Sequence, residues 1–232
     1  MIRKIRDSGK HKVDGLNEDM VVAQSIVFLA AGFETSASTM AMLIYILAKH
    51  PHVQEKCYEE ILEVSSTDEN KIDSDTIGKM KYLEACIQET LRLYPIVLRN
   101  QRYCSKDSNV NGMQIKKGTS IIVPTWAMHR NPVLFGKDAK EFVPERFLEG
   151  AGADYISNHT FHAFGGGPRT CIGMRFAMAE MKIAISKLLI NFVFKDEPGI
   201  TNLVFEKGGY FLLTYSDINV RIKKRNNCCK DV

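Results

Sequence analysis

The segment FGGGPRTCIG, residues 164–173, is the most informative stretch of this 232-residue chain. It places one cysteine, Cys171, between a glycine-rich turn and a stretch of helical periodicity that begins at Gly173. Three successive glycines allow a backbone to approach a bulky group closely. The unpaired N–H groups of a helix N-terminus favour a thiolate over a thiol. The segment therefore predicts that Cys171 is a nucleophile or a metal ligand.

The rest of the chain has the patterns of a mainly helical protein. Hydrophobic periodicity, N-caps and prolines predict helices over residues 17–48, 51–64, 79–93 and 173–190. Short strands are expected over residues 96–103, 109–110, 113–115 and 119–123, with Asn111-Gly112 as a hairpin turn, and a final strand pair within 204–220. Residues 131–170 are expected to form a long loop. The predicted fold is mainly α with a small segregated β-sheet, an α+β arrangement.

Composition and charge exclude several classes of protein. With 45% apolar and 25% charged residues, the chain is an ordinary globular sequence. Met1–Lys12 and Arg221–Val232 each carry five basic residues and one acidic residue, so the net charge of +4 arises at the ends and no nucleic-acid-binding face is indicated. The most apolar stretch, Met20–Gly32, is shorter than the ~20 residues of a spanning helix, and no signal peptide precedes it.

Three further segments carry weaker signals. In Ala31-Gly-Phe-Glu-Thr-Ser36, Gly32 lowers helix propensity and the Thr35 hydroxyl can bond back to the Ala31 carbonyl, which would open the helix. Glu89 and Arg92 have i,i+3 spacing and can pair on one helix face. Pro144-Glu-Arg-Phe147 lies in the long loop. Each of these segments alone is more typical of a structural feature than of a site.

Together the four segments resemble, in order, the motifs of the cytochromes P-450, the haem-thiolate monooxygenases. The stretches AGFETS, ETLRLYP, PERF and CIGMRFAMAEMK are similar to the family-three, subfamily-A branch. The resemblance implies the C-terminal half of the cytochrome P-450 fold, with a partial haem domain over residues 17–220. A basic polar lead-in (residues 1–16) and a basic tail (221–232) would flank it. The absent half would hold the membrane anchor and the roof of the substrate pocket.

The same resemblance implies the roles of individual residues. It implies haem b as cofactor, with the Cys171 thiolate as the axial ligand of the iron. The other cofactor-binding positions that it implies are Phe164 and Gly173 near the thiolate, Ala31 over the haem face, and Arg169 and Arg102 at the propionates. Thr35 and Glu34 are the implied catalytic residues, with Thr35 hydrogen-bonding dioxygen and Glu34 helping to deliver protons. Glu89, Arg92 and Arg146 would form a buried network behind the haem.

The function implied by the resemblance is insertion of one oxygen atom of O2 into a lipophilic, drug- or steroid-like substrate. The chain has no GxGxxG motif for a nicotinamide or flavin. Electrons would therefore come from the NADPH-dependent cytochrome P-450 reductase, with cytochrome b5 as a second candidate. The implied location is the cytosolic face of the endoplasmic reticulum membrane, reached through the absent half.

Two alternatives stay open beside this interpretation. The first is a truncated haem-binding or inert remnant of such an enzyme, without turnover. The second is a cysteine-dependent hydrolase in which His129 or His162 serves as the base for Cys171. No local protease signature supports the second alternative, and we expect both histidines to be structural or exposed.

Overall fold

A computed structural model gives the structure of the chain. It describes residues 18–65, 72–148, 154–155, 158–196, 205, 212–213, 215 and 217–225. The predicted basic lead-in, the predicted cap Asn17 and most of the basic tail lie outside these residues.

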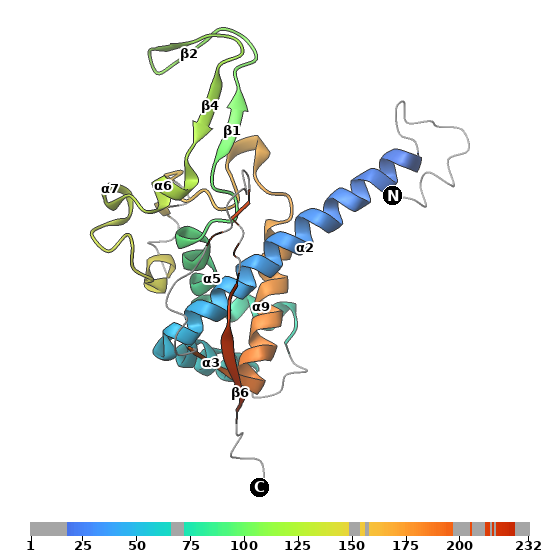
Figure 1. The fold of residues 1–232 in the computed structure, drawn as a ribbon, viewed down its shortest axis with the longest axis vertical. Helices are drawn as coiled ribbons and strands as arrows, with labels where there is room; N and C mark the ends of the chain where they lie inside the picture. The colour runs from blue at the N-terminus through green and yellow to red at the C-terminus, as the bar shows by residue number, and fades with distance from the viewer. Residues whose placement is uncertain are drawn as a thin grey trace.

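The four predicted helices are present, which confirms the mainly helical fold (Figure 1). They are α2 (Glu18–Lys49), α3 (Pro51–Ser65), α5 (Lys81–Leu93) and α9 (Met174–Asn191). Acidic residues in the first turn of α2 and a lysine in its last turn match the helix dipole. Pro51 then opens α3 at a position where a helix needs no N–H donor.

Two short helices outside the predicted loop were not predicted, α4 (Ser74–Lys79) and α6 (Thr125–His129). Helix α4 directly precedes α5, and Met80 separates the two. The Asp73 side chain caps α4 by accepting a hydrogen bond of 2.9 Å from the Thr76 N–H. A helix of six residues is too short to show hydrophobic periodicity, so only this cap could have indicated it.

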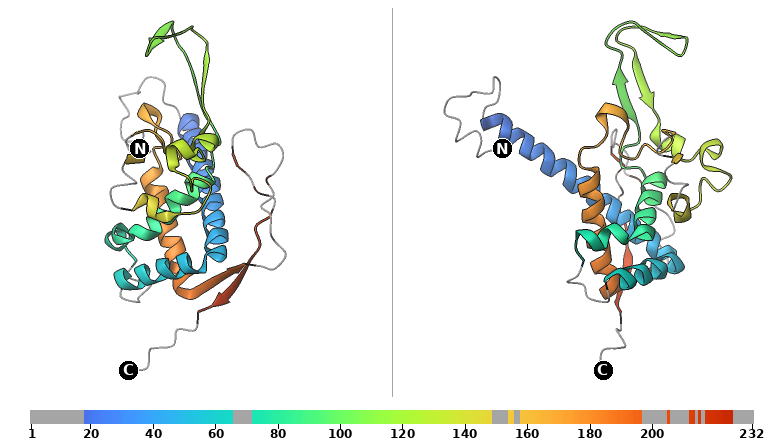
Figure 2. Two further views of the ribbon diagram at one scale, coloured as in Figure 1. Left: turned by 90° about the vertical axis from the view of Figure 1, so that its left-hand side faces the viewer. Right: turned by 180° about the vertical axis from the view of Figure 1, so that it is seen from behind.

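Within the described ranges the strands form three separate two-stranded antiparallel sheets. The pairs are β1 (Asn100–Tyr103) with β4 (Ser120–Val123), β2 (Ser108–Val110) with β3 (Met113–Ile115), and β5 (Phe192–Asp196) with β6 (Val220–Lys224). The first two sheets follow one another in a hairpin arm that extends from the helical body (Figure 2). Asn111 and Gly112 have φ of 50° and 85° at its turn, as an Asn-Gly hairpin requires.

Several predicted strand bounds were wrong. Strand β1 begins at Asn100, and only an isolated bridge at Val97 precedes it. Strand β5 was not predicted, because it follows α9 without a turn signal. Its partner β6 begins at the last residue of the predicted 204–220 pair, and most of that range lies outside the described residues.

The predicted loop over residues 131–170 contains short helical turns. Helix α6 (Thr125–His129) precedes it, and α7 (Pro132–Phe135) and the 3-10 helices η2 (Pro144–Phe147) and η3 (Gly167–Arg169) lie within it. Each of these three inner turns has a proline in its first turn, where the fixed φ favours helical geometry. Of these turns, η2 contains the PERF segment.

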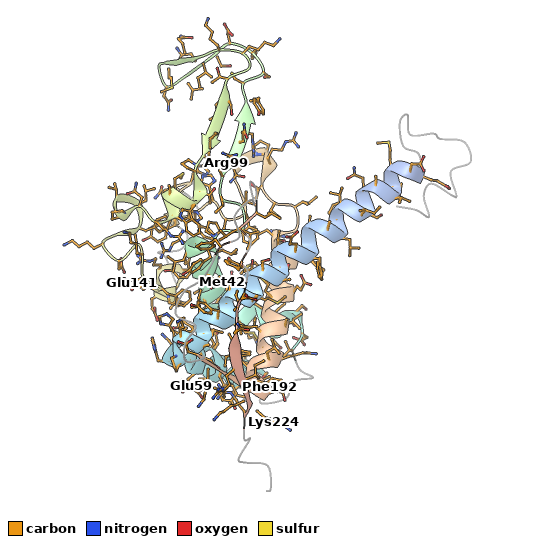
Figure 3. All side chains as sticks on the ribbon, in the orientation of Figure 1. Met42, Glu59, Arg99, Glu141, Phe192 and Lys224 are labelled. Atoms are coloured by element: carbon orange, nitrogen blue, oxygen red, sulfur yellow. The ribbon has the colours of Figure 1, made fainter. Side chains whose placement is uncertain are left out.

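The core lies where the C-terminal half of α2 packs against α3, α5 and α9. Its fully buried members include Leu43, Leu47, Leu83, Ile87 and Ile185. Figure 3 shows Met42 inside this body, whereas Glu59 and Lys224 lie at its edge. This packing leaves the N-terminal half of α2 projecting from the body (Figure 1). The large apolar side chains of this half are exposed.

Helix α2 is also long and apolar enough to cross a membrane. Its most apolar stretch has a mean hydropathy of 1.4 and is 22% buried. The sequence prediction expected a helix over residues 17–48 but judged its hydropathy on the run Met20–Gly32 alone, which is shorter than the apolar stretch of α2. A core helix of a soluble protein meets the same criterion, and the C-terminal half of α2 is such a helix.

Candidate functional site

The segment from His162 to Gly173, which we call the cysteine loop, is held by backbone hydrogen bonds within itself. The Cys171 N–H donates to the Phe164 carbonyl at 2.9 Å, and the Gly165 N–H donates to the His162 carbonyl at 3.0 Å. Gly165 and Gly167 have φ of 73° and 66°, in the left-handed region that favours glycine. Glycines are therefore required here by the path of the backbone itself.

The thiol of Cys171 is free and exposed. Helix α9 begins three residues later, with Gly173 as its N-cap and no side chain capping its first N–H groups. A Cβ added at Gly173 would lie 3.9 Å from the Cys171 Sγ, so this glycine borders the thiol. The cysteine loop thus presents one accessible thiol directly before a helix N-terminus, the arrangement expected for a ligand or nucleophile.

Two exposed guanidinium groups lie on segments that meet at this loop. Arg169 belongs to η3, and Arg102 lies on β1. A Cβ added at Gly165 would lie 3.6 Å from the Arg169 carbonyl and 3.9 Å from the Asn100 Oδ1, so the loop borders β1. Within the described part of the chain neither arginine forms an ion pair, and Arg102 donates only to the neighbouring Gln101 carbonyl. Both groups are therefore available to an external carboxylate.

The predicted hydrogen bond in α2 is present. The Thr35 Oγ1 donates to the Ala31 carbonyl at 2.6 Å, and one turn later the Thr39 Oγ1 donates to the Thr35 carbonyl at 2.8 Å. The predicted opening of the helix is not, because α2 continues unbroken to Lys49. Ala31 and Glu34 are exposed and Thr35 is half-buried.

The predicted site residues thus fall into two groups. Phe164, Arg169, Cys171 and Gly173 lie in the cysteine loop with Arg102 on the bordering strand, and Ala31, Glu34 and Thr35 lie on the projecting half of α2. No hydrogen bond or ion pair joins the two groups within the described residues. A haem-thiolate site needs a thiolate, cations for two propionates and apolar or small residues against the faces of the haem. An exposed thiol, two unpaired guanidinium groups and the exposed Ala31 fit those needs.

The Glu89–Arg92 pair on α5 forms the centre of a buried network. Its side chains are 0% exposed, and Arg92 donates to both Glu89 carboxylate oxygens, at 2.6 and 2.7 Å. The same guanidinium donates to the carbonyls of His129 and Ala139, both at 2.6 Å, and of Glu141 at 2.9 Å. All five donors are satisfied, which makes a buried arginine tolerable.

Arg146 of the PERF segment joins this network. Its Nε lies 3.4 Å from a Glu89 oxygen, an ion-pair contact. Its other nitrogens donate to the Phe135 carbonyl at 2.6 Å and to the carboxylate of Asp138 at 2.6 Å. The hydrogen bond from Arg146 holds the pKa of Asp138 below its usual range. The predicted network that ties the long loop to α5 is confirmed.

His129, at the end of α6, is a structural histidine, as the sequence indicated. It is 0% exposed, and its ring stacks on Phe161 with centroids 5.3 Å apart. Nδ1 lies 3.1 Å from the Arg92 carbonyl, and Nε2 accepts a hydrogen bond of 2.8 Å from the His162 N–H. Because a carbonyl only accepts, Nδ1 carries the proton. Both ring nitrogens are occupied, so His129 is not available as a base for Cys171. This excludes His129 from the hydrolase alternative.

Burial lowers the pKa of His129 to about 3, with the nearby Arg92 guanidinium as a smaller contribution in the same direction. In the unfolded chain His129 takes up a proton near pH 6.5, whereas in the folded chain it does so only near pH 3. Protonation of the unfolded state therefore lowers the free energy of unfolding as the pH falls from 6.5 toward 3, and above pH 6.5 this loss is absent. We expect this histidine to cost about 1.4 kcal/mol of unfolding free energy per pH unit below 6.5. Urea unfolding at pH 7, 6 and 5 measures this change in the free energy of unfolding. His129→Gln, which does not titrate, should show a shallower loss, and equal slopes would contradict the assignment.

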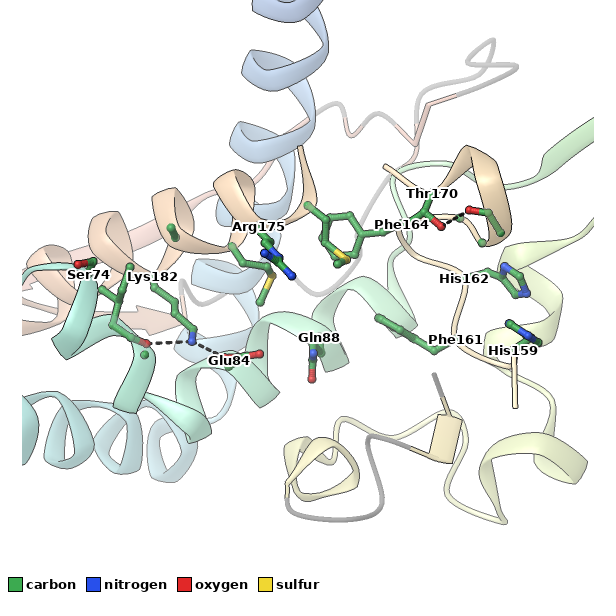
Figure 4. Close-up of a pocket in the computed structure, with 18 residues that line it drawn as sticks. Ser74, Glu84, Gln88, His159, Phe161, His162, Phe164, Thr170, Arg175 and Lys182 are labelled. Carbon is green, nitrogen blue, oxygen red and sulfur yellow. Dashed lines mark hydrogen bonds and ion pairs between the residues drawn. The ribbon is translucent and has the colours of Figure 1, made fainter. Parts of the chain in front are cut away.

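A cavity of about 910 Å³ lies between α4, α5, α9 and the cysteine loop (Figure 4). On one wall Lys182 pairs with Glu84 and donates to the Ile77 carbonyl at 3.0 Å. The remaining wall is largely apolar and includes Phe161, Phe164, Met174 and Met178. Sequence reasoning missed this cavity because its walls come from segments far apart in the chain.

Comparison with known proteins gives one consistent result. A family model described as cytochrome P450 matches residues 1–220. The chain is 44% identical over 190 residues to cytochrome P450 3A6 of Oryctolagus cuniculus, covering 82% of this chain and 37% of that protein. It is 39% identical over 223 residues to cytochrome P450 3A7 of Homo sapiens, covering 95% of this chain and 43% of that protein. The chain thus spans about two fifths of the length of these relatives.

Proposed function

This chain belongs to the cytochrome P450 family, with relatives of the 3A type, and we propose that it binds haem b through the Cys171 thiolate as part of a monooxygenase. The observation that carries the proposal is the cysteine loop: an exposed, free thiol directly before α9, on a loop packed beside the buried Glu89–Arg92 network. The thiol is accessible to a ligand, while the start of its loop is hydrogen-bonded to the buried His129.

Several residues would hold the cofactor. The Cys171 thiolate would bind the iron, and the forked guanidinium groups of Arg169 and Arg102 would each bind a propionate. Phe164 and Gly173 would border the thiolate, and the small side chain of Ala31 would allow a flat ring to approach α2. When bound, haem supplies the iron that activates O2.

Two residues of α2 would donate a hydrogen bond and transfer protons near the cofactor. The Thr35 hydroxyl has its proton committed to the Ala31 carbonyl at 2.6 Å. Rotation of this side chain would let the hydroxyl donate its hydrogen bond to a polar ligand bound beside α2. The exposed Glu34 carboxylate, one residue earlier, would accept a proton from solvent and release it toward the same place.

The substrate and partners that we propose follow from the family. The substrate would be a lipophilic, drug- or steroid-like molecule, and electrons would come from an NADPH-dependent cytochrome P-450 reductase, with cytochrome b5 as a second donor. Exposed Lys137, Lys140 and Arg175 are candidate docking cations for the reductase. The location would be the cytosolic face of the endoplasmic reticulum membrane.

A second candidate function is a haem-binding remnant without turnover. The observation in its favour is the projecting half of α2, where large apolar side chains, including Phe28 at 60% and Phe33 at 75% exposure, are not covered by the described residues. The two candidates differ in product formation. Both predict haem binding through Cys171, but only the monooxygenase converts a lipophilic substrate when a reductase and NADPH are supplied.

The role of Thr35 is testable by coupling measurements on haem-loaded protein. We expect Thr35→Ala to bind haem but to divert electrons from product to peroxide or water, because no hydroxyl remains to donate a hydrogen bond at that site. The ratio of product formed to NADPH consumed measures this. Thr39→Ala removes the same kind of hydroxyl one turn later and serves as the matched control. Unchanged coupling in Thr35→Ala would contradict the proposed role.

A further inference from the structure

We propose that His129 is a positioning residue that fixes the start of the cysteine loop relative to α5, and through it the position of the Cys171 thiol. Its importance for haem rests on the proposed function, in which Cys171 is the axial ligand. The positional link itself is a property of the protein without cofactor.

His129 is first fixed to the end of α5 by a reciprocal pair of hydrogen bonds. The Arg92 guanidinium donates to the His129 carbonyl at 2.6 Å, and the His129 Nδ1–H donates to the Arg92 carbonyl at 3.1 Å. The Arg92 side chain is itself held by the buried Glu89 carboxylate. The imidazole is therefore attached to the fully buried centre of the network.

The orientation of the imidazole is fixed by packing. Phe161 stacks on it at an interplanar angle of 13°, and Phe135 meets it edge-on with centroids 5.9 Å apart. With Nδ1 committed to Arg92, the remaining nitrogen Nε2 points at the His162 N–H and accepts its hydrogen bond at 2.8 Å. Burial keeps the ring neutral, so Nε2 retains the lone pair that this hydrogen bond needs.

This contact differs from the other hydrogen bonds of residues 162–171. The Gly165, Thr170 and Cys171 N–H groups all donate to carbonyls inside the same segment. Within the described residues, the bond from His162 to His129 ties the start of the segment to the rest of the protein, whereas the Met174 N–H, which donates to the Cys171 carbonyl at 3.5 Å, joins its end to α9. Two steps within the segment then lead to the thiol: the Gly165 N–H donates to the His162 carbonyl, and the Cys171 N–H donates to the Phe164 carbonyl.

Amide hydrogen exchange on the haem-free chain tests the link. His129→Phe keeps an aromatic ring for the stack on Phe161 but leaves the His162 N–H without an acceptor. We expect exchange at the His162 and Cys171 amides to become about tenfold faster or more, while amides of α5 change less. His129→Gln offers one acceptor and one donor and should restore most of the protection. His50→Phe alters a half-buried histidine outside the loop and should leave these amides unchanged.

Two results would overturn the inference. One is unchanged exchange in the loop of His129→Phe. The other is equal acceleration in the loop and in α5, which would show that His129 supports the whole fold and not the position of the loop.

A second readout separates this inference from the proposed function. After haemin is added and the protein is reduced under carbon monoxide, His129→Phe should lose part of the red-shifted Soret band that a thiolate ligand produces, and His129→Gln should recover it. If the unmodified chain shows no such band, the proposed function fails, while the exchange experiment still decides the role of His129. If His129→Phe keeps the full band, the positioning of the thiol by His129 is wrong.

Discussion

Replacing Arg92 by alanine is expected to lower the free energy of unfolding by about 3–5 kcal/mol. The Arg92 side chain is 0% exposed and makes five hydrogen bonds, two to Glu89 and three to backbone carbonyls. Its removal leaves the buried Glu89 carboxylate with the Arg146 contact at 3.4 Å as its remaining ion pair and one hydrogen bond of 2.9 Å from the Val143 N–H. Urea unfolding followed by circular dichroism measures the loss.

Two further variants make this result specific. Lys116→Met breaks an ion pair with Asp107 whose side chains are 81% and 61% exposed, and we expect no measurable change in stability. Arg92→Lys should remain strongly destabilised, because one ammonium group cannot replace a fork that reaches a carboxylate and three carbonyls. If Arg92→Ala were as stable as Lys116→Met, the buried network would not be what holds the long loop to α5.

Replacing Cys171 by serine is expected to abolish the thiolate signature of bound haem. A serine hydroxyl is a poor replacement for the soft, electron-donating thiolate. The expected result is complete loss of the red-shifted Soret band under carbon monoxide, with little change in the far-ultraviolet circular dichroism, because the Cys171 side chain is exposed.

Cys104→Ser is the matched control for this variant. Cys104 is a half-buried free cysteine, and its Sγ donates to the Lys106 carbonyl at 2.9 Å. We expect this variant to keep the red-shifted band. If the band survived Cys171→Ser but disappeared in Cys104→Ser, the iron ligand would be Cys104 and the assignment to Cys171 would be wrong.

The sequence predicted those parts of the fold and site that local patterns encode. Periodicity and proline positions placed the four long helices, and Asn111-Gly112 identified the hairpin turn. The Thr35 hydrogen bond could be predicted because its acceptor lies four residues earlier. The i,i+3 pair of Glu89 and Arg92 could be predicted for the same reason. These interactions depend on residues within one helical turn.

The parts that could not be predicted depend on contacts between distant segments. Strand β5 exists because it pairs with β6, and no turn signal marks its start after α9. The His129 ring meets a backbone N–H that lies 33 positions later in the chain. Nothing in the residues around His129 specifies that partner, and the same holds for the cavity walls contributed by α4 and α9. The family resemblance supplied Arg146 as a member of the buried network, but not this histidine.

The most direct test of haem binding through Cys171 is the optical spectrum of the chain with added haemin, reduced under carbon monoxide. We predict a strongly red-shifted Soret band, which shows that the exposed thiol of the cysteine loop ligates the iron as a thiolate. A Soret band at the ordinary position, or no bound haem, would contradict the proposal that these residues form a haem-thiolate site.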